Sequence, residues 1–178
     1  MEKFNLNITV ETDRLVLRPV SDEFKFDICN EFTPEVTKFM PFTPTGDMKV
    51  TEDFIARSNQ ELISGKGIQF CIIEKESNEF LGCCGLHHTD TKAVEIGLWL
   101  KKSVHGIGYG TEIVREFVGL AEKNLDIDYL FYPVDKDNCA SRKIPEKLGF
   151  IPTRSYEKKK SVTENLHIIE YRKKKCGT

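Results

Sequence analysis

From residue 93 the chain reads Ala-Val-Glu-Ile-Gly-Leu-Trp-Leu (93–100), then Lys-Lys-Ser-Val (101–104), then His-Gly-Ile-Gly-Tyr-Gly (105–110). The first segment is a short, mostly apolar run that charged residues follow, which predicts a buried strand. After Gly110 the apolar residues adopt the spacing of a helix, at Ile113, Val114, Phe117, Val118, Ala121 and Leu125. Three glycines therefore lie where a strand gives way to a helix.

A junction of this kind is suited to binding phosphate. Glycine lets backbone N–H groups turn toward one point, and a helix start adds N–H groups without partners and the positive end of the helix dipole. The two common nucleotide fingerprints fit poorly. Gly110-Thr111 lacks the lysine of the phosphate-binding loop, and the third glycine comes one residue too early for Gly-x-Gly-x-x-Gly. An ordinary glycine-rich turn is the alternative without a ligand.

Composition sets limits on the class of protein. A chain of 178 residues suits one domain, spanning residues 1–178, and a net charge of −2 argues against a nucleic-acid partner. No apolar run approaches the ~20 residues that cross a bilayer, so no membrane partner is expected. The six cysteines have neither Cys-x-x-Cys nor metal-binding spacing, which favours free thiols in a cytoplasmic protein without a metal. Cys83 and Cys84, as neighbours on a strand, should point to opposite faces.

The rest of the chain predicts an α/β (α+β) protein with a mixed, mostly antiparallel, seven-stranded sheet and helices on both faces. The expected strands are 11–18, 68–74, 80–86, 93–100, 129–134, about 150–157 and 163–172. Two short helices are expected within 20–48, one from an N-cap at Thr51 to Ser64, one from the glycine loop to Asn124, and one at 139–148 capped by Asn138.

Three motifs, in this order along the chain, resemble the GCN5-related N-acetyltransferase (GNAT) superfamily. Residues 105–110 resemble its Gln/Arg-x-x-Gly-x-Gly/Ala pyrophosphate loop, with His105 in place of Gln or Arg. Glu11-Thr12-Asp13-Arg14-Leu15-Val16-Leu17-Arg18 is similar to the opening strand of the ribosomal-protein N-acetyltransferase branch. Asn138-Cys139-Ala140-Ser141, followed by Glu146-Lys147-Leu148-Gly149-Phe150, resembles the second cofactor segment of that branch.

The resemblance implies a V-shaped split between the fourth and fifth expected strands, 93–100 and 129–134. The pantetheine arm of acetyl-CoA would lie in this split, with its thioester near Leu98 to Leu100 and the Leu98 N–H as oxyanion donor. Region 20–48 would cover the acceptor site. The residues expected to contact coenzyme A are Leu98, Trp99, Leu100, His105, Gly106, Ile107, Gly108, Tyr109, Gly110, Thr111, Asn138, Ser141 and Arg142.

Acetyl transfer to an amine needs a base, because amines are mostly protonated at neutral pH. Glu95 is the candidate, since it is the only charged residue in the apolar run 93–100. A structural glutamate paired with an arginine or lysine is the alternative. His87 and His88 are weaker candidates, which a surface turn explains more simply.

Ser141 is the candidate proton donor to the leaving thiolate, because the resemblance places it near the sulfur. Asn138 and Ser141 could equally act only as capping residues of the helix, and Arg142 as an ordinary exposed basic residue. Pro145 cannot donate an N–H to the Ser141 carbonyl, which predicts a kink or a loosened turn around 141–145.

The expected function is an acetyl-CoA-dependent N-acetyltransferase that works by direct attack of a primary amine. The amine belongs either to a protein N-terminus or to a small molecule, and the enzyme is a monomer or a homodimer. One alternative is a non-catalytic coenzyme A-binding sensor or interaction module. Another is a nucleotide-binding module, which would bind ATP or NAD in place of acetyl-CoA.

Overall fold

The computed structural model describes residues 8–175, and an eight-stranded sheet runs through this part of the chain. The strand order is β1-β2-β3-β4-β5-β6-β8-β7, and only β5 and β6 run parallel. The strands are β1 (Val10–Glu11), β2 (Leu15–Pro19), β3 (Gly67–Glu74), β4 (Phe80–His87), β5 (Ala93–Leu100), β6 (Tyr129–Asp135), β7 (Ile151–Lys159) and β8 (Asn165–Lys174). The mixed, mostly antiparallel sheet is confirmed, but the predicted count of seven strands is wrong.

The additional strand comes from segment 11–18, which was expected to form one strand. A turn divides it into β1 and β2, because the Thr12 hydroxyl accepts a hydrogen bond from the Leu15 N–H at 3.0 Å. A threonine side chain can offer the backbone this alternative to a continuous ladder. The predicted alternation holds within β2, where Leu15 and Leu17 are fully buried.

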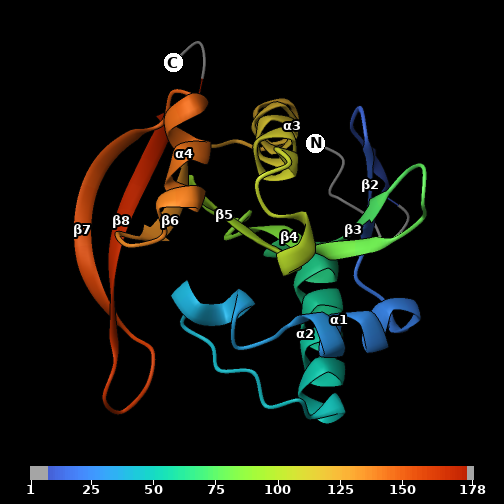
Figure 1. The fold of residues 1–178 in the computed structure, drawn as a ribbon. Helices are drawn as coiled ribbons and strands as arrows, with labels where there is room; N and C mark the ends of the chain where they lie inside the picture. Colours follow the sequence, from blue (N-terminus) through green and yellow to red (C-terminus); the bar gives the residue numbers. More distant parts are fainter. Residues whose placement is uncertain (1–7, 176–178) are drawn as a thin grey trace.

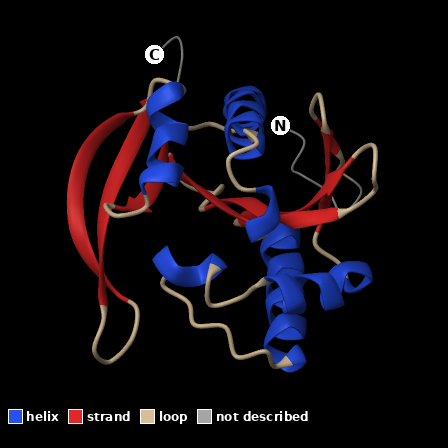
Figure 2. Ribbon diagram, in the orientation of Figure 1, coloured by secondary structure: helices blue, strands red, loops and turns tan. Residues whose placement is uncertain are grey.

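Four α-helices and three short 3-10 helices accompany the sheet in the described residues. They are η1 (Asp22–Phe24), α1 (Lys25–Glu31), η2 (Val36–Phe39), α2 (Met48–Ser64), η3 (Lys102–Val104), α3 (Tyr109–Asn124) and α4 (Cys139–Lys147). Figure 1 shows α3 and α4 over one face of the sheet, and α1 and α2 over the other. Figure 2 makes the same layering visible by colour, which confirms the prediction of helices on both faces.

Helix α2 begins earlier than predicted. Its N-cap is Asp47, whose carboxylate accepts a hydrogen bond from the Lys49 N–H at 2.9 Å, whereas Thr51 lies inside the helix and is buried. Both residue types cap helices well, and the tertiary position of the chain selects the aspartate. The helix ends as predicted, with Gly65 in the left-handed conformation at φ 72°.

Each face of the sheet has its own hydrophobic core. Under α3 and α4, Ile113, Val114 and Phe117 pack against strand residues that include Cys84. Under α1 and α2, Ile28 and Ile55 pack against a cluster that includes Cys83. The neighbouring cysteines therefore do point to opposite faces, as predicted.

The parallel pairing of β5 and β6 is short. It joins Ala93 to Tyr129, Val94 to Leu130 and Glu95 to Phe131, and within the described chain it stops there. Beyond this point β6 continues to Asp135 paired with β8 alone, while β5 continues to Leu100 paired with β4 alone. The predicted split between 93–100 and 129–134 is therefore confirmed, with Glu95 and Phe131 at its apex (Figure 1).

An ion pair fixes the start of α3 to the turn between β1 and β2. Glu112, in the first turn of α3, accepts hydrogen bonds from the Arg14 backbone N–H at 2.9 Å and from the Thr12 hydroxyl at 2.5 Å. The Arg14 guanidinium lies 2.7 Å from the same carboxylate and 4.3 Å from the centre of the Tyr109 ring. It also donates to the Ile107 carbonyl at 3.4 Å. Through Arg14, these contacts fix Ile107 of the glycine loop and the first turn of α3 to the turn between β1 and β2.

Replacing Glu112 by glutamine should lower the free energy of unfolding by about 1–2 kcal/mol. Hydrogen bonds to a charged group contribute about 1.5–3 kcal/mol, and the partial exposure of Arg14 reduces this contribution. Thermal unfolding should then show a fall in Tm of about 2–8 °C. Glu116→Gln, one turn further along α3, is the matched control and should change Tm by no more than about 2 °C.

The same ion pair makes stability depend on pH. Burial raises the pKa of Glu112, but hydrogen bonds from Thr12 and Arg14 outweigh burial and hold that pKa below its ordinary value. A carboxyl with a lowered folded pKa adds stability above its unfolded pKa of about 4.3, and this is lost as pH falls through the folded value. The Tm difference between the parent and Glu112→Gln should therefore shrink below about pH 4. An undiminished difference at about pH 3 would contradict the charged role.

Candidate functional site

The glycine loop between β5 and α3 has an open backbone. Gly106 and Gly108 have φ values of 82° and 99°, a conformation that favours glycine. In the described chain, the N–H groups of Gly106, Ile107 and Gly108 donate to no backbone carbonyl. Gly108 is the N-cap of α3 and has no side chain to satisfy the first helical N–H groups. The loop therefore offers a set of N–H donors at the positive end of a helix, which fits a diphosphate.

The third glycine of the loop has a different role from the other two. A Cβ on Gly110 would lie 2.7 Å from Cδ1 of Ile144 on α4 and 3.2 Å from Cδ2 of Leu98 on β5. Such a Cβ fits only if the end of the Ile144 side chain moves. Gly110 therefore also permits close packing of α3 against α4 and β5, while its expected part in binding coenzyme A stays a prediction.

Two further residues fix the ends of the loop. The Nε2 atom of His105 lies 2.8 Å from the Leu100 carbonyl oxygen, so the imidazole is bound to the end of β5. Lys101 is buried and forms an ion pair with Glu79. Among the predicted loop residues, Tyr109 is also buried, and its hydroxyl donates to Glu74. Their side chains thus shape the loop, while its backbone remains the candidate ligand-binding surface.

The end of β5 contributes backbone to the split. Leu98 and Leu100 are half-buried and pack toward the core under α3 and α4, whereas Trp99 packs against Phe80 and Phe32 on the opposite face. The side of β5 that faces the split has no pairing with β6 from Ile96 onward in the described residues. Unpaired backbone groups of this kind need a hydrogen-bonding partner, and an extended amide-containing arm would supply one.

The predicted second cofactor segment lies at the start of α4. The Asn138 side-chain oxygen accepts a hydrogen bond from the Ser141 N–H at 3.2 Å, so Asn138 is the N-cap, as predicted. The Ser141 hydroxyl lies 2.8 Å from the hydroxyl of Tyr132 on β6, beyond the apex of the split. Tyr132 is buried, and burial raises its pKa, although the hydrogen bond with Ser141 lowers it. Sequence reasoning missed this partner, whose only signal is a polar hydroxyl in an apolar strand.

Helix α4 continues through Pro145 to Lys147, so the proline does not end the helix, and the kink or loosened turn expected around 141–145 stays a prediction. Its carbonyl accepts from the N–H groups of Leu148 and Phe150 at 3.1 and 3.0 Å. The Arg142 guanidinium is engaged by the protein, donating to the Tyr171 hydroxyl at 3.2 Å and to the Lys136 carbonyl at 3.1 Å. These bonds hold Arg142 against β6 and β8.

The predicted base, Glu95, lies at the apex of the split, directly opposite His87 of the neighbouring strand β4. Directly opposed residues point to the same face of a sheet. The next residue on that face of β5 is Gly97, and a Cβ there would lie 3.0 Å from Nε2 of His87. The face that carries Glu95 and His87 is the one covered by α1 and α2.

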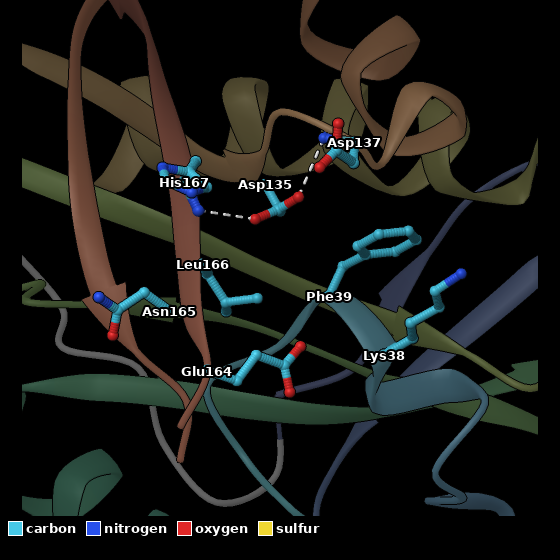
Figure 3. Close-up of a pocket in the computed structure, with 8 residues that line it drawn as sticks. All are labelled: Lys38, Phe39, Asp135, Asp137, Glu164, Asn165, Leu166 and His167. Atoms are coloured by element: carbon cyan, nitrogen blue, oxygen red, sulfur yellow. Dashed lines mark hydrogen bonds between the residues drawn. The ribbon is translucent and has the colours of Figure 1, made fainter. Parts of the chain in front are cut away.

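A pocket of about 400 Å³ opens on the same side of the sheet, between η2, the end of β6 and the β7–β8 hairpin. Figure 3 shows the side chains of Phe39, Leu166 and Glu164 pointing into this space. Asp135 is buried at its inner wall and accepts hydrogen bonds from the N–H groups of Asp137 and His167, each at 2.9 Å. The lining combines the ring of Phe39 with the carboxylates of Asp135, Asp137 and Glu164, and it also includes Lys38.

The Lys160 side chain donates to the carbonyl of Lys38 at 2.5 Å, and Lys102 forms an ion pair with Glu35 at 3.1 Å. These contacts join the segment around η2 to the β7–β8 hairpin and to the loop after β5. Within residues 8–175 no group of three or more His, Cys, Asp or Glu residues could hold a metal ion, and no helix is long and apolar enough to span a membrane.

Comparison with known proteins identifies the family. Residues 14–151 match the model of the acetyltransferase (GNAT) domain. An uncharacterised N-acetyltransferase, p20 of Bacillus licheniformis, is 32% identical over 158 residues, covering 85% of this chain and 89% of the relative.

Solved structures share the fold at low sequence identity. RimJ of Mycobacterium smegmatis, in complex with CoA-disulfide, superposes with a TM-score of 0.82 at 17% identity, covering 94% of this chain and 88% of its own. The acetyl transfer enzyme of Salmonella typhimurium that modifies the N-terminal serine of ribosomal protein L7/L12 gives 0.78 at 16%, covering 92% and 96%. With a family model that spans most of its length, this chain belongs to the GNAT acetyltransferase family.

Proposed function

We propose that the protein transfers the acetyl group of acetyl-CoA to a primary amine. The observation that carries the proposal is the arrangement of a loop rich in free N–H groups at the open end of a split between β5 and β6. The loop fits the diphosphate, and the split fits the extended pantetheine arm. A group held at both points would have its acyl end directed toward the apex, near Glu95.

Three residues supply the chemistry in this proposal. Glu95 removes a proton from the acceptor ammonium group, and the neutral nitrogen attacks the thioester carbonyl carbon. The N–H of Leu98 stabilises the oxyanion that forms. The C–S bond then breaks with its electron pair on sulfur, and the Ser141 hydroxyl donates a proton to the thiolate. Tyr132 holds the Ser141 hydroxyl in place through their 2.8 Å hydrogen bond.

Direct attack is favoured over an acyl-cysteine intermediate by the state of the cysteines in the sheet. Cys83 and Cys84 are buried, and burial raises the pKa of each thiol well above its ordinary value. Only the thiolate is a good nucleophile, so these residues are poor acyl carriers.

The acceptor we favour is the α-amine of a protein N-terminus, which enters from the side of η2 and the β7–β8 hairpin. An α-amine has a pKa of about 7.7–8.0, so less work is needed to deprotonate it than a lysine ammonium group. The pocket beside Phe39 and Asp135 provides apolar contact and carboxylates on that side. The Salmonella typhimurium enzyme of the same fold modifies an N-terminal serine, which supports this choice.

Gly108→Val tests the cofactor site. A β-branched residue at φ 99° is strained by about 1–3 kcal/mol, so the variant should bind acetyl-CoA at least about tenfold more weakly. Isothermal titration calorimetry measures this affinity directly. Gly119→Val, on the exposed side of α3 with no atom near its Cβ, is the matched control and should bind as the parent does. Equal affinity of both variants would refute the loop as the diphosphate site, as would binding of ATP or NAD in place of acetyl-CoA.

Ser141→Ala tests the transfer step. Release of the coenzyme A thiol is followed with three acceptors: a peptide with a free N-terminal serine, the same peptide N-terminally blocked but containing lysine, and spermidine. The variant should lose about 10–100-fold in kcat at neutral pH with unchanged acetyl-CoA affinity. The difference in kcat between the parent and the variant should become smaller above about pH 8.5, where the leaving thiolate no longer needs a proton. Ser64→Ala, at the end of α2, is the control. A parent protein that binds acetyl-CoA but acetylates no acceptor would support a sensor in place of an enzyme.

A further inference from the structure

The sheet face covered by α1 and α2 carries a polar cluster beside Glu95. His87 and Glu95 are direct partners in the β4–β5 ladder, so their Cβ atoms are about 4.5–5.5 Å apart on one face. His87 is half-buried, in contrast to the exposed neighbour His88. The simple explanation of both histidines as surface-turn residues therefore fails for His87.

Two glycines make room for this cluster. A Cβ on Gly97 would lie 3.0 Å from Nε2 of His87, so the imidazole lies over Gly97, beside Glu95 on the same face of β5. A Cβ on Gly85 would lie 2.4 Å from Oε1 of Gln69. The space left by each missing side chain is occupied by one polar side chain, His87 over Gly97 and Gln69 over Gly85.

Gln69 holds the imidazole. Its amide nitrogen lies 3.0 Å from Nε2 and 3.3 Å from Nδ1 of His87. An amide N–H can donate only to an unprotonated ring nitrogen, so this contact favours the neutral imidazole, which can accept a proton. Burial acts in the same direction and lowers the pKa of His87.

The charges around His87 come from four elements. Glu95 on β5 raises the pKa of the imidazole. His88, directly after β4, and Lys158, on β7, lower that pKa. Tyr156 on β7 also interacts with the Glu95 carboxylate. On α2, Oε2 of Glu61 would lie 3.2 Å from a Cβ on Gly67, the strand partner of His87. Glu95 is thus the charged group that most directly stabilises a proton on His87.

We propose that His87 and Glu95 act as one proton-accepting pair for the acceptor amine, with Gln69 as the residue that positions the imidazole. The inference rests on the proposed acetyltransferase function and deepens it. An ammonium group must lose two protons to become an amide nitrogen, one before attack and one after the N–C bond forms. The pair receives both and releases them to solvent. The C–S electron pair stays on sulfur, which is protonated by Ser141, and Ser141 regains its proton from solvent.

The first experiment follows the imidazole of His87 by NMR across pH in the isotopically labelled protein without acceptor. In Glu95→Gln the apparent pKa of His87 should fall by about half a unit or more, because an adjacent carboxylate stabilises the imidazolium. An unchanged His87 titration would overturn the pair. This measurement does not depend on knowing the acceptor or on catalysis.

The second experiment compares His87→Asn with the matched control His88→Asn in acetyl transfer to the most active amine of the acceptor panel. His87→Asn should lower kcat by about 10–100-fold, leave the affinity for acetyl-CoA within about twofold, and remove one ionisation from the acid side of the pH–rate profile. His88→Asn should keep the parent kcat and retain the acid-side ionisation, moved slightly upward because His88 lowers the pKa of His87. Gln69→Ala should lower kcat and shift the ionisation without removing it.

The double variant separates a pair from two independent effects. If His87 and Glu95 act as a unit, His87→Asn with Glu95→Gln should be no more than about threefold slower than the slower single variant. The inference would be overturned if the kcat losses of the two single variants multiply in the double variant. It would also be overturned by an unchanged pH profile in a folded His87→Asn variant. Either result leaves the acetyltransferase function intact. A parent protein that neither binds acetyl-CoA nor acetylates any amine would overturn both.

Discussion

Backbone hydrogen bonding is the constraint on which this structure depends. Strands β5 and β6 share only three residue pairs, and beyond Glu95 their facing edges separate. A sheet interior rarely leaves backbone N–H and C=O groups unpaired, because an unsatisfied buried group costs about 1–3 kcal/mol. The backbone groups along the opening are therefore available to hydrogen-bond an extended, amide-like partner or water. The placement of the glycine loop, of Ser141 and of Glu95 around that opening follows from the same separation of strands.

Ion pairs and hydrogen bonds orient the polar side chains around the split. The ion pair of Glu112 with Arg14 joins the start of α3 to the turn between β1 and β2. The hydrogen bond from Asn138 holds the first turn of α4, so the Ser141 hydroxyl and the Tyr132 hydroxyl stay in contact. On the other face, Gln69 holds the ring of His87. Polar side chains near the split are thus oriented by neighbours on separate elements, which limits their freedom before any ligand binds.

Sequence patterns predicted most of the architecture because they reflect local preferences. The helical spacing after Gly110, the cap at Asn138, the glycine that ends α2 and the alternation of Leu15 and Leu17 all depend on neighbours in the chain. Resemblance to the family supplied the split, which no local pattern indicates. The two errors in element bounds, at β1 and at the start of α2, arose where two capping or turn-forming residues compete and tertiary position decides between them.

The partners of the candidate site could not be predicted in the same way. Tyr132 meets Ser141, and Gln69 meets His87, only because of strand register and helix packing, which a single sequence does not specify. The role of Gly110 was also hidden, because a glycine beside two others in a loop gives no sign that a side chain from α4 lies against it. Long-range contacts, and not residue types, distinguish these positions.

The close approach at Gly110 has a mechanical consequence. Three elements meet at this glycine: α3, which carries it, α4 through the end of the Ile144 side chain, and β5 through the end of the Leu98 side chain. A larger residue there would have to displace the ends of both side chains. A substitution at this single position would therefore disturb the packing of α3 against α4 and against β5 at the same time.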